Sequence, residues 1–132
     1  MDHVEQIASA GQLLAIIIRV AVAPAATTFV TAVELEQQVG FVVYPAGGIV
    51  PRHLHPPLPR QTSGTSEVIV VKHGRCELDV YDGARSLVAT RELAAGDVML
   101  LVAGGHGFRM LEDTVLLEVK QGPYVASEKE AF

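Results

Sequence analysis

Four residues of this 132-residue chain have the types and the spacing of metal ligands. His53 and His55 are separated by one residue, so they would project from the same face of an extended strand. Glu67 opens the next apolar stretch, and His106 follows two glycines that permit a sharp bend. Three imidazoles and a carboxylate suit Fe, Mn, Ni, Co or Zn better than Mg or Ca. We therefore predict a site for a divalent transition metal.

Each of these residues also fits a structural role when it is taken alone. Histidines alternate by chance on surface strands, Glu67 suits a solvated strand end, and His106 suits a turn between glycines. The order of the features favours the metal hypothesis. The pair His53 and His55 is followed by Glu-x6-Gly, and then by Gly-x9-His, which ends at His106.

Two further residues are candidates for binding a substrate. Arg60 follows the proline-rich residues 56–59, whose rings restrict the backbone to an extended form. Its guanidinium would pair with a carboxylate or phosphate, although a solvated loop arginine is the alternative. Tyr44 ends an apolar stretch near a turn, where a place at the rim of the site and a packing role are both compatible with the sequence.

No catalytic acid or base is identified from the sequence. Glu118 and Lys120 share one face of residues 114–122, and we expect this polar pair to face water. The alternative is that one of the two projects inward as a general acid or base.

The elements that must position these residues are short strands. Apolar and β-branched stretches with turn signals about every 8 to 12 residues predict an all-β protein. The clearest strand contains Cys76, Leu78 and Val80 in alternation with polar residues. We expect at most a helical turn or two in the first dozen residues and a solvated tail at 125–132. The expected strands cover residues 13–23, 27–33, 38–45, 66–74, 75–83, 86–93, 96–105 and 114–122.

Composition excludes several classes of protein. With 49% apolar and 19% charged residues, the chain is expected to fold as one compact domain spanning residues 1–132. Its formal charge of −5 and scattered basic residues argue against nucleic acid as a partner. Cys76 is alone, so no intramolecular disulfide forms. Arg19 interrupts the N-terminal apolar run, which favours a cytoplasmic protein without a membrane partner.

The N-terminal strands predict self-association. Residues 13–23 and 27–33 are more apolar than the outside of a small barrel should be. An uncovered apolar strand invites pairing, so we expect a homodimer.

The sequence resembles the cupin superfamily over roughly residues 38–122. GGIVPRHLH and EVIVVKHG are similar to the first cupin motif, with Gly47, His53 and His55 at its opening and Glu67 and Gly74 at its close. GDVMLLVAGGHGF is similar to the second motif, with His106 as the third histidine. The strings GGHGFRMLEDT and LLEVKQGPY further resemble small single-domain cupins encoded among sugar and polysaccharide biosynthesis genes.

This resemblance implies a cupin-type double-stranded β-helix, or jelly-roll barrel, with additional N-terminal strands. It implies His53, His55, Glu67 and His106 as the ligands of the metal. The function expected is that of a metal-dependent enzyme acting on a small polar metabolite, such as a sugar derivative or organic acid. Isomerase or epimerase, lyase and dioxygenase chemistry remain open, and a non-catalytic small-molecule or sugar-binding protein is the alternative.

The chain departs from the family pattern in four ways. Eleven residues separate His55 from Glu67, whereas three or four are usual, so water is an alternative to the Glu67 ligand. Val102 stands where proline is usual, and His106 comes one residue early. Met110 takes the place of an asparagine.

Overall fold

The computed structural model describes all of residues 1–132 and contains two compact units. One unit comprises Met1–Val22 together with Gly64–Phe132, and the other comprises Ala23–Ser63. Apart from a 3₁₀ turn, η1 (Ala126–Glu128), all regular structure is strand, which confirms the predicted all-β class. The strands are β1 (Val4–Ser9), β2 (Gln12–Ile18), β3 (Thr28–Phe29), β4 (Gly40–Phe41), β5 (Glu67–His73), β6 (Arg75–Tyr81), β7 (Leu87–Ala94), β8 (Val98–Leu101), β9 (Gly105–Met110) and β10 (Val115–Lys120).

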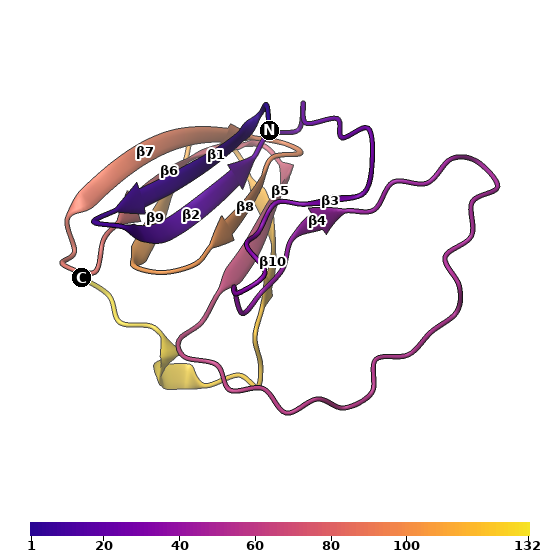
Figure 1. Cartoon of the computed structure of the whole chain (residues 1–132). Coiled ribbons are helices and arrows are strands. Elements are labelled where there is room, and N and C mark those ends of the chain that lie inside the picture. The colour runs from indigo at the N-terminus through magenta and orange to yellow at the C-terminus, as the bar shows by residue number, and fades with distance from the viewer. The chain divides into compact units, whose positions relative to one another are not determined.

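The first unit contains two antiparallel sheets (Figure 1). The larger has five strands in the order β1-β2-β8-β5-β10, and the smaller has three in the order β7-β6-β9. All pairings within them are antiparallel. Strands β9 and β10 each lie at an end of their sheet, so each has one edge without a partner strand in this unit.

A shared hydrophobic core joins the two sheets. The alternation expected for residues 75–83 is confirmed, because Cys76, Leu78 and Val80 of β6 are buried while their neighbours are partly exposed. Ile69 and Val71 of β5 alternate in the same way. The core cluster consists of Ile7, Leu14, Ala15, Ile17, Ile69, Val71, Cys76, Leu78, Val80, Leu93, Met99 and Leu101.

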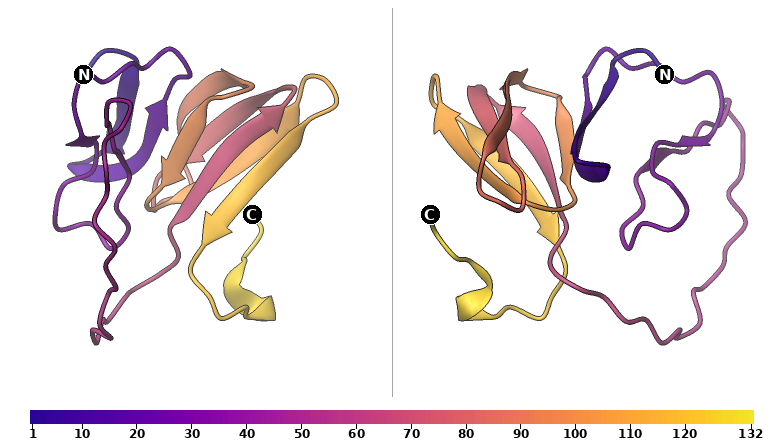
Figure 2. Two further views of the ribbon diagram at one scale, coloured as in Figure 1. Left: turned by 90° about the vertical axis from the view of Figure 1, so that its right-hand side faces the viewer. Right: turned by 60° about the vertical axis from the view of Figure 1, so that its left-hand side comes forward.

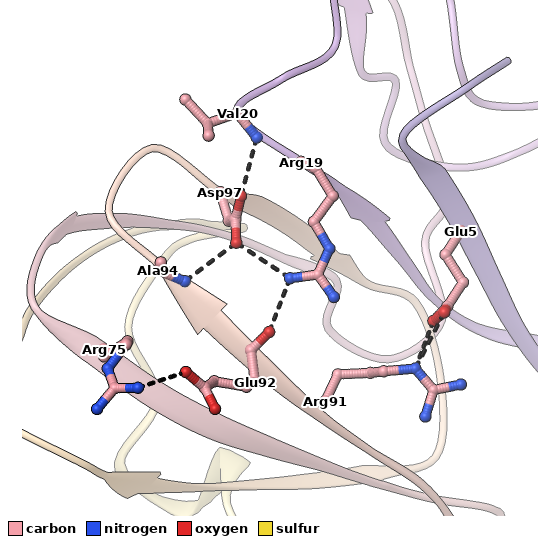
Figure 3. A network of polar contacts seen from close by, with 8 residues as sticks. All are labelled: Glu5, Arg19, Val20, Arg75, Arg91, Glu92, Ala94 and Asp97. Carbon is pink, nitrogen blue, oxygen red and sulfur yellow. Dashed lines mark hydrogen bonds and ion pairs between the residues drawn. The ribbon is translucent and has the colours of Figure 1, made fainter.

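A buried carboxylate connects the end of β2 to the turn between β7 and β8 (Figure 3). Asp97 accepts hydrogen bonds from the backbone N–H groups of Val20, at 2.8 Å, and Ala94, at 3.0 Å. It also pairs with the guanidinium of Arg19 at 3.1 Å, and the same Arg19 nitrogen donates to the carbonyl of Glu92. These bonds hold segments together that are distant in the sequence.

The N-terminal residues differ from two of the expectations. Residues 4–9 form strand β1 rather than a helical turn, because they pair with β2 across the tight turn at Ala10 and Gly11. The apolar residues 12–18 are not an uncovered edge, since β2 lies between β1 and β8. The apolar character of this segment therefore reflects a central strand, and it no longer supports a dimer.

The second unit has little regular structure. Strands β3 and β4 have only two residues each, and they pair with each other. The Thr31 hydroxyl donates to the Gln38 side chain at 2.8 Å, and Glu36 accepts a bond from the backbone N–H of Ser63 at 3.0 Å. Residues 42–66 contain no strand, so the predicted strand at 38–45 is reduced to Gly40–Phe41.

The C-terminal segment turns back after β10. It passes through η1, and in Figure 2 the chain end returns toward the sheets of its own unit. Most of residues 125–132 are exposed, but Glu128 is partly buried and the ring of Phe132 lies 5.1 Å from that of Tyr81. The fold has no helix with the length and hydropathy needed to cross a membrane.

Candidate functional site

His106 is the second residue of strand β9. Gly104 precedes this strand with a φ of +71°, and a Cβ atom at this position would clash with the carbonyl oxygen of Tyr81. Glycine is therefore required for the bend that leads into the strand. Within β9, His106 is opposite the buried Val80 and shares a face with Phe108, which packs against the core. The imidazole thus projects from the inner face of the smaller sheet.

Glu67 is the first residue of strand β5, and only 8% of its surface is exposed. It continues the inward face of Ile69 and Val71, so strand alternation places a carboxylate at the end of an apolar row. Gly74 ends the same strand with a φ of +87° and allows the hairpin to β6. The interval from Glu67 to Gly74 therefore has a structural explanation: it is one strand and the turn that follows it.

The two sheets bring these two residues together. The Nε2 atom of His106 lies 3.2 Å from an Oε atom of Glu67, although the residues are far apart in the sequence. The side chains are 32% and 11% exposed, so the carboxylate is the more enclosed member of the pair. The prediction that Glu67 and His106 are neighbours is thus met within one unit.

Burial changes the protonation of both groups. Desolvation raises the pKa of Glu67, and the neighbouring Glu118 carboxylate raises it further. Desolvation also lowers the pKa of His106, an effect that Lys129 reinforces and Glu118 opposes. The lowered pKa of His106 favours the neutral imidazole, which is the form that binds a metal ion.

Glu118 and Lys120 share the inner face of β10, and the expectation that they face water is met for Glu118, which is exposed, but not for Lys120, which is partly buried. They share the parity of Leu116, which packs against the core, while Val115, Leu117 and Val119 are exposed. Lys120 is the direct pairing partner of Glu67, and its Nζ lies 3.5 Å from the Glu118 carboxylate. Strand parity indicates that these two polar residues share a face, but it does not say which face is inward.

His53 and His55 lie in the second unit, on an exposed segment that is not a strand. The expected strand geometry is therefore absent, but the two rings are still neighbours, with centroids 5.2 Å apart. The Nδ1 atom of His53 lies 2.7 Å from the carbonyl oxygen of Pro51. A carbonyl only accepts, so Nδ1 is the donor in this contact, and metal-binding histidines commonly make such a bond through the ring nitrogen that does not bind the metal.

The four predicted ligands thus form two pairs, one in each unit. No group of three or more His, Cys, Asp or Glu side chains is arranged to hold a metal ion. The donor types nevertheless fit a transition metal, since one histidine is neutral by burial and another is oriented through its second nitrogen.

The predicted substrate-binding residues, Tyr44 and Arg60, also belong to the second unit. Tyr44 is 51% exposed and Arg60 is exposed. The Tyr44 side chain lies against Gly48, and the exposure of Arg60 fits a solvated loop arginine as well as a ligand contact. Their role in binding stays a prediction.

Comparison with known proteins adds no assignment: no family model, curated protein or solved structure matches the chain. The function is therefore argued from the geometry of the two residue pairs and from the polar groups around them.

Proposed function

We propose that the chain is a metal-dependent enzyme of the cupin type that acts on a small polar metabolite, such as a sugar derivative or an organic acid. His53, His55, Glu67 and His106 would hold a divalent transition metal. The observation that supports this proposal is the enclosed contact between Glu67 and His106, which places two of the four donors 3.2 Å apart. A bound metal would polarise a carbonyl, hydroxyl or carboxylate oxygen, or would activate O2 if it is iron.

Glu118 favours an enzyme over a purely binding protein. Its carboxylate lies beside Glu67 and is 39% exposed on its side chain, so it is accessible to a ligand. It is a candidate general acid or base, and isomerase, lyase and dioxygenase reactions could each use such a group.

Metal content is the first test of the proposal. The wild-type protein is expected to retain a transition metal after dialysis, and His53→Ala and His106→Ala should each lower the affinity by at least about 100-fold, since even loss of a residue that only orients a ligand costs about 10–100-fold. His73→Ala is the matched control, because His73 is exposed at the end of β5. Equal metal in all four proteins would contradict the ligand assignment.

Limited proteolysis tests whether the two pairs act on one metal. Trypsin is expected to cut first after Arg52 and Arg60, which are exposed and outside strands. Added metal should slow these cuts in the wild type. His106→Ala, at a position in the other unit, should abolish the protection. Protection that survives this substitution would indicate a metal held by the segment of Arg52 alone.

Turnover separates the enzyme from a non-catalytic binding or sensing protein. Metal-loaded protein should convert a sugar derivative or organic acid, with or without O2 uptake, and Glu118→Gln should lower the rate while metal content is unchanged. Ligand binding without any conversion across the panel would favour the sensing role.

We also propose that two copies of the chain associate. The outer face of β10 presents Val115, Leu117 and Val119, each about half exposed, on a strand whose edge has no partner within its unit. An apolar row beside an unpaired edge fits an isologous contact with a second copy.

A further inference from the structure

Residues 51–60, PRHLHPPLPR, form an extended segment of the second unit that belongs to no sheet. In Figure 1 they are part of the long open stretch between β4 and β5. No strand, turn or bend occurs from residue 48 to residue 63, and no hydrogen bond between backbone groups involves residues 49–63. An extended backbone whose polar groups are left to solvent is characteristic of a polyproline II helix.

Prolines restrict the conformation of this segment. Pro51, Pro56, Pro57 and Pro59 each have φ fixed at about −65°, which is close to the polyproline II value. The residue before each proline is also driven into the extended region. The segment is therefore preorganised, so a partner that binds it in this form pays little conformational entropy.

Both ends of the segment are held by contacts within the second unit. Before it, the backbone N–H of Gly48 donates to the carbonyl of Pro45 at 3.0 Å. After it, the backbone N–H of Ser63 donates to the Glu36 carboxylate at 3.0 Å. The segment is thus presented to solvent between two fixed points.

The exposed side chains of the segment are apolar or basic. Every residue from 42 to 65 is exposed, and Leu54 and Leu58 are 76% and 66% exposed. Arg52 and Arg60 add positive charge, and no Asp or Glu lies between residues 49 and 63, although the whole chain has a formal charge of −5. A partner complementary to this surface has an apolar groove with acidic side chains beside it.

The periodicity of a polyproline II helix divides the side chains into rows. The helix has three residues per turn, so every third residue lies in one row. The three rows are His53, Pro56 and Pro59; Arg52, His55 and Leu58; and Leu54, Pro57 and Arg60. The first two rows form one edge, which carries Leu58 and Pro59 side by side, and Pro57 lies off this edge.

We propose that residues 51–60 are a docking segment for a protein domain that receives proline-rich segments in an aromatic-lined groove. Domains such as SH3 and WW bind PxxP segments in this way, and Pro56 and Pro59 have that spacing. A stiff spacer would also account for the prolines, but it does not account for two exposed leucines among them. The inference goes beyond the proposed function and does not rest on the metal site.

Titration of the full chain with a panel of purified SH3 and WW domains tests the docking. The readout is the amide spectrum of the isotope-labelled chain by NMR, recorded in EDTA so that no metal contributes. At least one domain should shift the signals of Leu54 and Leu58 and leave those of β6 unchanged. The affinity should fall as NaCl is added, because salt screens the attraction between the basic segment and an acidic partner.

Two single substitutions distinguish docking from stiffness. Pro59→Ala removes a ring from the docking edge, so it should weaken binding by at least about tenfold. Pro57→Ala is the matched control, because it removes the same ring from the third row, and it should weaken binding by less than about threefold. Both variants should unfold in urea at the midpoint of the wild type, since both positions are exposed and outside strands.

Three results would each overturn the proposal. The first is that no domain of the panel shifts the signals of the segment. The second is an equal loss of affinity in Pro57→Ala and Pro59→Ala, which would mean that the prolines act only by stiffening the chain. The third is that Pro59→Ala changes the mass of the protein in light scattering and not its affinity for the domains, which would assign the segment to a contact between copies.

Discussion

Asp97, whose carboxylate is buried, is a single residue on which we expect the stability of the fold to depend. The Asp97 carboxylate accepts two backbone N–H groups and pairs with Arg19 while only 4% of the residue is exposed (Figure 3). Asp97→Ala would leave the N–H groups of Val20 and Ala94 without an acceptor. We expect a loss of about 2–4 kcal/mol in the free energy of unfolding, measured by urea denaturation.

A partly exposed aspartate serves as the control for this prediction. Asp79 accepts a hydrogen bond from Thr90 at the surface, and Asp79→Ala should cost less than about 1 kcal/mol. Equal losses of unfolding free energy in the two variants would show that the buried contacts of Asp97 stabilise the fold no more than the single hydrogen bond of Asp79 does.

The buried thiol gives a second prediction at this scale. Burial raises the pKa of Cys76, and the nearby Asp97 charge acts in the same direction, so the group stays a thiol at neutral pH. A thiol-specific reagent such as dithionitrobenzoate should react slowly with the native protein at pH 8 and at once in guanidinium chloride. Fast, complete reaction of the native protein would contradict the buried position.

At the scale of elements, glycine turns fix where the strands of the site begin and end. Gly74 has a φ of +87°, and a Cβ atom there would clash with the carbonyl oxygen of Asp113. Gly74→Ala should therefore cost more than about 2 kcal/mol in unfolding free energy, from the sum of backbone strain and steric overlap. Thermal denaturation followed by circular dichroism measures the effect.

Gly83→Ala is the matched control in the next hairpin. Gly83 has no positive φ, and a Cβ atom at this position would have no other atom within 4 Å, so its substitution should change the stability by less than about 0.5 kcal/mol. A similar loss of stability in both variants would show that the positive φ of Gly74 and the overlap with Asp113 are not the cause of the loss in Gly74→Ala.

Some elements are predictable from the sequence and others are not, for physical reasons. Apolar alternation identifies β5 and β6, and a hairpin loop over residues 82–86 joins β6 to β7. The short strand β1 is not distinguishable from a helical turn, because six residues with few apolar positions fit both periodicities. For β10, alternation identifies the two faces, but the apolar face proves to be the outer one.

The candidate site, like the strands, is only partly predictable from the sequence. Glu67 and His106 are found close together, but only the strand of Glu67, β5, is predicted, because no expected strand covers residues 106–110 of β9. The expectation that Glu118 and Lys120 face water is met for the exposed Glu118 and fails for Lys120, which is partly buried. The strand geometry of His53 and His55 fails because the flanking residues 56–59 contain three prolines, which cannot donate to a sheet ladder.

At the scale of the whole molecule, the exposed apolar row of β10 allows a test of self-association. If two copies meet through this face, Leu117→Glu should convert the dimer to a monomer, because it places a charge in an apolar contact. Light scattering after size-exclusion chromatography gives the mass.

The control for this prediction lies on the other sheet. Leu87 begins β7 and is 57% exposed, so Leu87→Glu adds the same charge at a position outside the proposed contact and should leave the mass unchanged. A monomeric wild-type protein, or loss of the dimer in both variants, would exclude β10 as the contact.

The position of β2 between β1 and β8 has a consequence for biosynthesis. The β1 and β2 hairpin is made first, but its second neighbour, which pairs Ala15 with Leu101, leaves the ribosome only when most of the chain has been translated. Until then the isoleucines at 16, 17 and 18 lack half of their hydrogen-bonding partners, in a nascent chain that has no core to cover them. Residues 12–18 are therefore the apolar stretch of this chain that waits longest for the strand that covers its second edge.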